Sequence, residues 1–235
     1  MANFVICAAL PEEAGGLYGK RLPHRRMISD PFFISGHKVY VIISGVGEKN
    51  MRSLLKRFPA DQQIDYWVSY GLAGGLKEEL AVGECFFGTT VNSGEGASYH
   101  FAVPSVLLAD FSNYVLLSRQ SIADTPDVKK MLFLQTGGAL VDMEAAAVAR
   151  HAQERGEGFF WLKVVSDSAE ETLPPEMASC LGSNGFPSLL KALQVLLKKP
   201  HLIYTLIRFQ QRTKVLSIRL AEKLHALLLQ WAESS

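Results

Sequence analysis

Residues 141–167, VDMEAAAVARHAQERGEGFFWLKVVSD, combine a helix signal with a strand signal. The alanine-rich run Met143–Arg155 predicts a helix, with Asp142 as its N-cap and Gly156 as its stop. Phe159–Val165 is short, continuous and apolar, which is typical of a strand that is buried on both faces. A helix that leads directly into a buried strand is typical of the α/β class.

The rest of the chain alternates in the same way. Asn3–Leu10 and Asp65–Tyr70 predict buried strands, and Lys49–Phe58 predicts a helix. Gly71–Gly75 follows the second of these strands and predicts a tight turn. These elements predict a single α/β domain over residues 1–235. Further elements are expected at Glu12–Tyr18 (helix or turn), Pro31–Ile34 and Lys38–Ser44 (a hairpin), Glu84–Val91, Tyr114–Ser118 and Ala139–Val141 (strands), Pro126–Leu134 (helix) and Asn184–Trp231 (helices).

Composition limits the class of protein. The chain has 235 residues, of which 48% are hydrophobic and 20% are charged, and this is typical of one globular domain. Cys7, Cys85 and Cys180 form no CxxC pair, so we expect a reducing compartment and no disulfide. The scattered histidines predict no metal site. The opening segment lacks a signal peptide and no run of 18 apolar residues occurs, so we expect a cytoplasmic protein without a membrane span.

Basic residues are concentrated in the last part of the chain. Residues 184–235 contain eight Lys or Arg and two acids, whereas the remaining 183 residues contain 16 basic and 21 acidic residues. We call residues 184–235 the basic tail and expect helices in it, with breaks near Pro187 and Pro200. An amphipathic basic helix either lies on an anionic membrane surface or packs on the sheet or on a second subunit. Its apolar stripe consists of Leu189, Leu190, Leu193, Leu196 and Leu197, beside Lys191, Lys198 and Lys199.

Acidic residues follow the apolar strands at several points. Glu13 follows the first strand, Asp142 and Glu144 lie where a strand meets a helix, and Asp167 ends another strand. Each has a structural explanation, because an acid favours the first turn of a helix by about 0.3–1 kcal/mol and can cap a helix or form a turn. However, α/β proteins bind ligands at the carboxyl ends of their strands, so the combination indicates a functional site at one edge of the sheet.

Taken in order, these segments resemble the purine nucleoside phosphorylase and nucleosidase family. Within it, the chain is most similar to the hopanoid-associated phosphorylases, which act on adenosylhopane. The segments that carry the family resemblance are Ala8–Glu13, Ser44–Gly47, Gly71–Leu76, Val141–Ala145 and Val165–Asp167. The features that resemble the hopanoid-associated subgroup are Val141–Ala149, the short segment between Ser93 and Gly137, Leu173–Pro175 and the basic tail.

The resemblance implies a three-layer fold with a central mixed sheet between helices. It also implies catalytic roles for three acids. Glu144 accepts hydrogen bonds from the ribose hydroxyls, Asp167 protonates or hydrogen-bonds N7 of the purine, and Glu13 orients or deprotonates the attacking water. The implied substrate contacts are Met143 beneath the sugar, with Val141, Asp142, Ser121, Ile122, Gly71, Leu72 and Ser166 around the sugar and base.

The chemistry of the N-glycosidic bond accounts for these residue types. Its cleavage builds positive charge on the ribose, which a carboxylate stabilises. It also builds negative charge on the base, and an acid that neutralises this charge typically accelerates such a step by about 10²–10⁴-fold. We therefore expect Glu144 to be ionised, and Asp167 to be buried and protonated. We expect no cofactor.

Two positions depart from the phosphorylases of the family, which hold phosphate with an arginine and a serine or threonine. Ser69 and Leu72 stand there, and leucine cannot hydrogen-bond an anion. We therefore expect water as the nucleophile, with phosphate left open as a co-substrate. Lys163 stands where relatives often have arginine, about 13 Å from Asp167 along the strand, and we expect no direct contact between them.

Three functions remain open at this point. The first is a nucleosidase for an adenosyl lipid such as adenosylhopane, with the basic tail at the inner membrane. The second is the same chemistry on a soluble nucleoside such as methylthioadenosine, adenosylhomocysteine or futalosine. The third is a non-catalytic nucleoside-binding protein. The resemblance implies a homodimer, and we expect no nucleic-acid partner.

Overall fold

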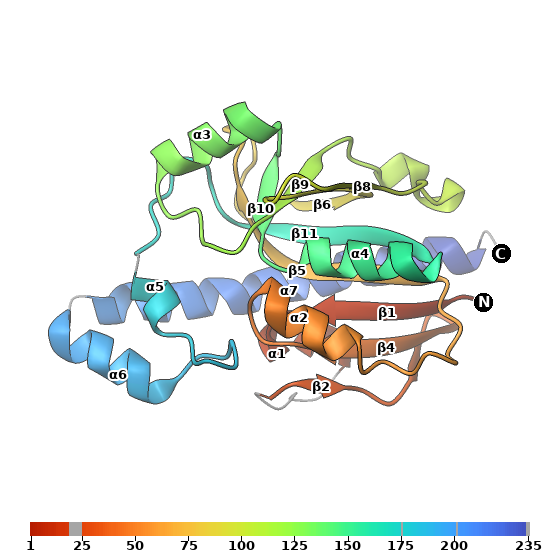
Figure 1. Ribbon diagram of the computed structural model, residues 1–235, viewed down its shortest axis with the longest axis horizontal. Coiled ribbons are helices and arrows are strands. Elements are labelled where there is room, and N and C mark those ends of the chain that lie inside the picture. Colours follow the sequence, from red (N-terminus) through yellow and green to blue (C-terminus); the bar gives the residue numbers. More distant parts are fainter. Residues whose placement is uncertain (19–24, 175, 201, 234–235) are drawn as a thin grey trace.

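The computed structural model describes residues 1–18, 25–174, 176–200 and 202–233, and one mixed sheet forms its centre (Figure 1). The strand order is β2-β4-β1-β5-β10-β9-β7-β8, with β11 beside β5 and β6, and β3 beside β4. The strands are β1 (Asn3–Ala8), β2 (Met27–Ile28), β3 (Phe32–Ile34), β4 (His37–Ile43), β5 (Tyr66–Gly75), β6 (Cys85–Gly88), β7 (Thr90–Ser93), β8 (Ser98–His100), β9 (Val115–Ser118), β10 (Leu140–Asp142) and β11 (Gly158–Asp167).

The centre of the sheet brings the acid-bearing strand ends together. β1 pairs in parallel with β4 and with β5, and β5 pairs in parallel with β11. The carboxyl ends of these strands therefore lie at one edge of the sheet. β10 pairs antiparallel with Gly74 and Gly75 at the end of β5, which carries Asp142 to the same edge.

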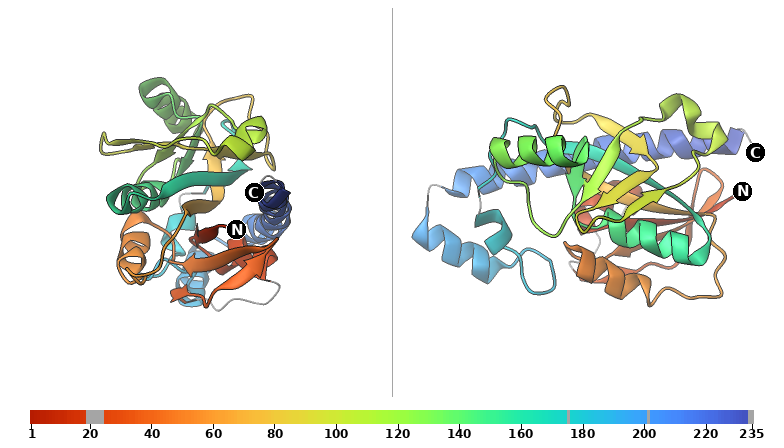
Figure 2. Two further views of the ribbon diagram at one scale, coloured as in Figure 1. Left: turned by 90° about the vertical axis from the view of Figure 1, so that its right-hand side faces the viewer. Right: turned by 45° about the horizontal axis from the view of Figure 1, so that its top comes forward.

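Helices cover both faces of the sheet, so the predicted three-layer α/β fold is confirmed (Figure 2). α1 and α7 contact each other on one face, over a buried cluster that includes Phe4 and Phe160. α2 and α4 contact each other on the other face, over a second cluster that includes Trp67 and Trp161. The helices are α1 (Pro11–Tyr18), α2 (Glu48–Leu55), α3 (Pro126–Thr136), α4 (Ala145–Arg155), α5 (Glu176–Ser179), α6 (Leu189–Lys198) and α7 (Leu202–Glu233).

The stretch at 141–167 folds largely as predicted. α4 begins at Ala145, later than the predicted start, so its N-cap residue is Glu144 and not the predicted Asp142. The Asp142 carboxylate still accepts a hydrogen bond from the Ala145 N–H, at 3.1 Å. The helix ends at Gly156, whose φ of 67° lies in the left-handed region. β11 is longer than predicted, because Asp167 still pairs with Gly74 of β5.

The predicted glycine turn at Gly71–Gly75 is wrong. β5 continues through these residues to Gly75, since β11 pairs with it as far as Gly74 and β10 pairs with Gly74 and Gly75. Pairing on both sides overrides the local preference of glycine for a turn. The glycines have another role in the structure, which is to leave room for acidic side chains.

Several short elements differ from the sequence prediction. The predicted strand Glu84–Val91 is divided into β6 and β7. The hairpin of β3 and β4 is confirmed, with Ser35 and Gly36 at its turn in positive-φ conformations. The short strands β2 and β8, the 3₁₀ helix at Ser105–Asp110 and helix α5 were not predicted, because segments this short have no clear periodicity.

The basic tail forms α6 and α7, and its two ends pack differently. The C-terminal half of α7 buries Leu216, Leu220, Leu224 and Leu228 against α1 and the sheet. Nε2 of His37 lies 3.1 Å from the carbonyl oxygen of Leu228 and links this half to the start of β4. This half therefore follows the alternative in which the tail packs on the sheet.

The other end of the tail projects from the body of the protein (Figure 1). In α6 the side chains of Leu190, Leu193 and Leu197 are exposed. The side chain of Leu189 and the residue Pro175, both used in the sequence interpretation, lie outside the described part of the structure. No helix in the described part of the chain combines the length and the apolar character that a membrane span requires.

Candidate active site

The carboxyl edge of the sheet carries the acids that the sequence singled out. Glu13 lies at the start of α1, Asp142 ends β10, Glu144 precedes α4 and Asp167 ends β11. All of them are buried, with exposed fractions of 3% to 8%. Buried carboxyl groups need hydrogen bonds or counter-ions, and the structure supplies both in different ways to each.

Glu13 turns back onto the strands. Its Oε2 accepts hydrogen bonds from the backbone N–H groups of Ala9 and Leu10, each at 2.8 Å, and its Oε1 accepts one from Leu72 at 3.0 Å. A Cβ on Gly71, whose φ is +145°, would lie only 2.5 Å from Oε1, so glycine is required for this approach. Burial raises the pKa of Glu13 above its usual range, although these hydrogen bonds and Lys163 oppose the rise.

Lys163 is the counter-ion of this part of the site. It is buried in the middle of β11, and its Nζ lies 2.8 Å from Oδ2 of Asp142. Burial lowers the pKa of Lys163, but the charges of Asp142, Glu144 and Glu13 outweigh burial and raise it. As expected from the sequence, no ion pair joins Lys163 to Asp167 within the described residues.

Lys163 pairs directly with Asp142 and acts on Glu144 only through its charge. Oε1 of Glu144 accepts a hydrogen bond of 2.6 Å from the N–H of Gly47, at the start of α2. Burial and the neighbouring charge of Asp142 raise the pKa of Glu144 to about 8, against the lowering effects of Lys163 and the Gly47 bond. The surroundings of Glu144 therefore favour its protonated form, whereas the sequence predicted an ionised group.

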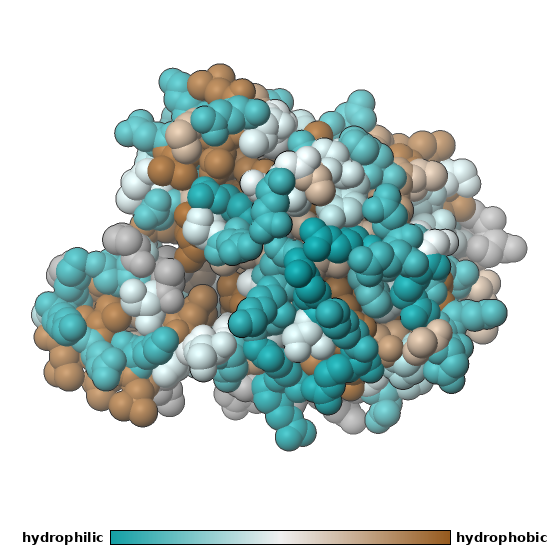
Figure 3. All heavy atoms as spheres, viewed as in Figure 1, coloured by the Kyte–Doolittle hydropathy of each residue, from teal (hydrophilic) through white to brown (hydrophobic). Residues whose placement is uncertain are grey.

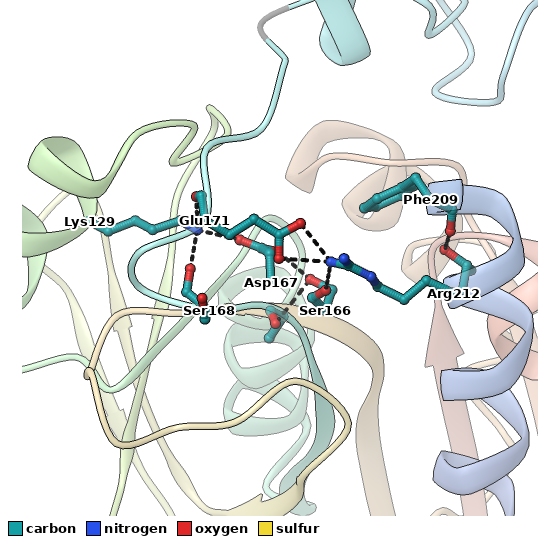
Figure 4. A network of polar contacts seen from close by, with 9 residues as sticks. Lys129, Ser166, Asp167, Ser168, Glu171, Phe209 and Arg212 are labelled. Carbon is teal, nitrogen blue, oxygen red and sulfur yellow. Dashed lines mark hydrogen bonds and ion pairs between the residues drawn. The ribbon is translucent and has the colours of Figure 1, made fainter. Parts of the chain in front are cut away.

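Asp167 has a counter-ion of its own, which the sequence interpretation missed. Lys129 of α3 is fully buried, and its Nζ donates to Oδ2 of Asp167 at 2.6 Å (Figure 4). It also donates to the carbonyl oxygens of Ser168 at 2.6 Å and Glu171 at 2.9 Å, so all three ammonium hydrogens have acceptors. The ammonium stabilises negative charge on the Asp167 carboxyl group.

Arg212 of α7 holds the segment after Asp167 from the opposite side. Its Nη1 donates to both carboxylate oxygens of Glu171, at 2.7 and 2.8 Å, and to the carbonyl oxygen of Ser166 at 3.1 Å. Figure 4 shows Ser168 and Glu171 between Lys129 and Arg212. Residues 168–171 are thus fixed between α3 and the middle of α7, and their position determines where Lys129 meets Asp167.

Gly74 allows Asp167 to lie flat on β5. A Cβ on Gly74 would lie 3.1 Å from Oδ2 of Asp167 and 3.3 Å from Cγ1 of Val141. The hydroxyl of Ser166 lies within hydrogen-bonding distance of Oδ1 of Asp167 and of the carbonyl oxygen of Ala73. The structure therefore brings together the predicted residues Val141, Ser166 and Asp167.

The other residues that the sequence singled out are less closely associated with the buried acids. Met143 and Leu72 are half-buried, and Leu72 packs against the core beneath α1 and α7. Ser121 and Ile122 lie in the segment from β9 to α3, where the exposed Ser121 hydroxyl accepts a hydrogen bond from Arg119 at 2.7 Å. Ser69, at one of the positions that hold phosphate in phosphorylases, is fully buried within β5.

A metal ion in the site would need a group of side chains among the described residues that could hold it. Within residues 1–18, 25–174, 176–200 and 202–233, no group of three or more His, Cys, Asp or Glu side chains could hold one. The charges near the acids come from Lys129 and Lys163 instead.

The comparisons with known proteins find similarity in structure only. No protein-family model matches the sequence, and no curated protein matches it. The 5'-methylthioadenosine/S-adenosylhomocysteine nucleosidase of Neisseria meningitidis, in complex with methylthio-immucillin-A, has a TM-score of 0.69 and 15% identity, over 97% of this chain and 99% of that chain. The same kind of nucleosidase from S. pneumoniae, with the transition-state inhibitor MT-ImmA, has a TM-score of 0.68 and 17% identity, over 97% and 99%.

A third match is the native futalosine hydrolase of Helicobacter pylori, with a TM-score of 0.67 and 13% identity, over 96% of this chain and 97% of that chain. These matches extend over nearly the whole length of both partners, at identities too low to carry a function across. The chain described above has the fold of the methylthioadenosine/adenosylhomocysteine nucleosidases and of futalosine hydrolase.

Proposed function

We propose that this chain hydrolyses the N-glycosidic bond of a purine nucleoside and releases the base. One observation carries the proposal: Glu13 and Asp167 are buried against Gly71 and Gly74 of the same strand, at the carboxyl edge of a nucleosidase fold. Glu144 lies near enough to Glu13 for the two charges to affect each other. Buried acids in contrasting environments are typical of sites for acid–base chemistry.

Asp167 is the proposed acid at the base. As the N-glycosidic bond breaks, its electron pair leaves with the purine. Lys129, at 2.6 Å, gives a proton to the Asp167 carboxyl group, which passes one to N7, and the neutral Lys129 takes a proton back from solvent after the base has left. The Lys129–Asp167 pair thus holds the proton that the leaving group needs, while the ammonium lowers the energy of negative charge beside it.

Glu13 and Glu144 act on the sugar side in this proposal. A carboxylate whose pKa is raised towards neutrality is a better base, so Glu13 suits the role of taking a proton from the attacking water. The water oxygen bonds to C1' of the ribose, and the proton taken by Glu13 balances the one delivered to the purine. Positive charge on the ribose favours the ionised form of Glu144, so the reaction uses the form of the protein in which Glu144 has already released its proton to solvent, and its carboxylate stabilises the transition state.

Water is the proposed nucleophile rather than phosphate. Ser69 is buried inside the sheet, and Leu72 contributes an apolar side chain. Neither supplies the charge-assisted hydrogen bonds by which proteins hold phosphate. Glu13, in contrast, is a carboxyl group with a raised pKa at this edge of the sheet, which supports its proposed role as a base for water.

An assay of purine release tests the proposal. Methylthioadenosine, adenosylhomocysteine and futalosine are each supplied with and without phosphate, and the sugar product is identified. We expect free base and free sugar at a rate that phosphate does not change. A sugar phosphate would contradict hydrolysis, and absence of release from every nucleoside would favour a non-catalytic binding protein.

The exposed leucines of α6 favour a second candidate substrate, an adenosyl lipid such as adenosylhopane. In the sequence, residues 168–188 connect Asp167 to α6, so the chain leads from the proposed acid to an exposed apolar surface. Faster adenine release from adenosylhopane in mixed vesicles than from methylthioadenosine would favour this substrate. We also propose a homodimer, as the resemblance implies, which sedimentation equilibrium would test.

A further inference from the structure

An apolar stripe runs along the outer face of α6 and continues at the start of α7. On α6 it consists of Leu190, Leu193 and Leu197, with exposed fractions of 73%, 56% and 77%. Positions i, i+3 and i+7 lie on one side of a helix, so these side chains form a continuous row. Ile203, Tyr204 and Ile207 extend the exposed apolar surface on α7. In Figure 3, hydrophobic side chains gather at the lower left, over this region.

Lysines border this stripe. Lys191 and Lys198 lie about 100° around α6 from the leucines at the helical repeat, so they flank the row without interrupting it. Together with Lys199 they line a cleft of about 390 Å³ between α5 and α6. Glu176 is the single acid that lines this cleft, and it is paired with Lys199. The cleft therefore has a net positive charge.

The charge of residues 177–221 favours an anionic partner over a second copy of this chain. From Met177 to Ala221 the sequence contains seven Lys or Arg and no Asp or Glu. Two copies of this surface placed face to face would bring together like charges, because the acid beside it, Glu176, is already paired with Lys199. An anionic partner meets the same surface with complementary charge.

We propose that the surface formed by α6 and the first two turns of α7 docks on an anionic lipid bilayer. The leucine row lies at the boundary between headgroups and acyl chains, while Lys198 extends along the interface to lipid phosphates. Nζ of Lys191 donates to the carbonyl oxygen of Leu181 at 2.6 Å, so this lysine adds positive charge beside the row. The C-terminal half of α7 is packed on the sheet, and Arg212 ties its middle to Glu171, so docking fixes the whole body relative to the membrane. Docking does not require the proposed reaction.

Co-sedimentation with vesicles tests docking without any substrate. The vesicles contain either equal parts of phosphatidylglycerol and phosphatidylcholine or phosphatidylcholine alone. We expect the full chain to bind the anionic vesicles, to lose binding as salt increases and not to bind the neutral ones. No binding to the anionic vesicles at low salt, or equal binding to both kinds, would overturn the proposal.

Paired variants assign the binding to this surface. Leu193→Asp with Leu197→Asp should abolish vesicle binding, whereas Leu134→Asp, at a leucine of α3 that is 73% exposed, should not change it. Lys198→Glu should weaken binding by at least about fivefold, and Lys130→Glu on α3 serves as its control. Because the changed side chains are exposed, the variants are expected to fold, which circular dichroism checks. If the Leu193→Asp/Leu197→Asp variant instead leaves vesicle binding intact and dissociates an oligomer, the surface is a subunit interface and the proposal is wrong.

Discussion

Two buried lysines serve the same edge of the sheet, and they are used in opposite ways. Among the described residues, Lys163 is influenced by three carboxyl groups, those of Asp142, Glu144 and Glu13. Its ion pair is with Asp142. Lys129 pairs with one carboxylate, Asp167, and gives its remaining hydrogens to two carbonyl oxygens. The first group has more carboxyl groups than positive charge, whereas the second is balanced.

This difference separates two acids that burial alone would treat alike. Glu144 and Asp167 are both almost completely buried. Burial and then the charge of Asp142 raise the pKa of Glu144 to about 8, and Lys163, which is already paired with Asp142, opposes the rise only in part. Asp167 has an ammonium of its own at 2.6 Å, which stabilises negative charge on its carboxyl group. The two acids therefore differ in their counter-ions and not in their burial.

Asp167→Asn should have the largest effect, on the balanced side of the comparison. The amide cannot give a proton to the leaving purine, so we expect kcat/KM for adenine release to fall by about 10²–10⁴-fold. The change also leaves Lys129 buried without its counter-ion. In the variant with both Asp167→Asn and Lys129→Met, thermal unfolding should recover towards the wild type, but activity should not. Recovered activity in the double variant would contradict the acid role of Asp167.

Lys129→Met should destabilise the protein by about 3–5 kcal/mol, because it leaves a carboxylate buried without a partner. Lys163→Met should be similarly harmful near pH 8, but its cost should decrease towards pH 5. The reason is that Glu144 and Glu13, whose pKa values are already raised, take up protons and no longer need the ammonium. Urea denaturation at both pH values measures the two variants. Equal pH dependence for both would show that the two sites do not differ in charge balance.

The sequence and the structure agree where the signal is local. The alanine-rich run of α4 and the apolar run of β11 each have one clear period, and both elements lie where they were predicted. Gly71–Gly75 misled the prediction, because the sequence shows the freedom of glycine but not the two acidic side chains that use the space. The acids themselves were found from their positions at strand ends.

Lys129 and Arg212 show what the sequence could not reveal. Lys129 stands next to Lys130 in a short helix, a pattern that usually marks a solvated face, and its partner is 38 residues away along the chain. Arg212 is one of several basic residues in the tail, and only the docking of α7 brings it to Glu171, 41 residues away. Both contacts depend on how helices sit on the sheet, which no local pattern encodes.

The two glycines of β5 allow a smaller test, since each contacts an acid from one side of the comparison. Gly71→Ala places a Cβ at 2.5 Å from Glu13 at a φ of +145°, so we expect a loss of at least about 1 kcal/mol of stability. Gly74→Ala meets Asp167 at 3.1 Å, which a small shift of the carboxylate can relieve. It should therefore unfold at nearly the wild-type temperature while losing activity. A larger loss of stability for Gly74→Ala than for Gly71→Ala would contradict these placements.

The last test is the pH dependence of stability through Glu144, whose effect is spread over several pH units. Its pKa is raised in the folded state, from the ordinary 4.5 to about 8, so the folded protein binds a proton there that the unfolded chain releases. That contribution is fully present below about pH 4.5 and is lost as the pH rises to about 8. Glu144→Gln remains neutral and keeps an acceptor for the N–H of Gly47. Its stability relative to the wild type should therefore increase across this range, by at most about 1.4 kcal/mol per pH unit.

The exposed Glu154 of α4 supplies the matched control, Glu154→Gln. If the difference between Glu144→Gln and the wild type is the same at pH 5 and pH 8, Glu144 is ionised throughout, and Lys163 serves its carboxyl groups as completely as Lys129 serves Asp167.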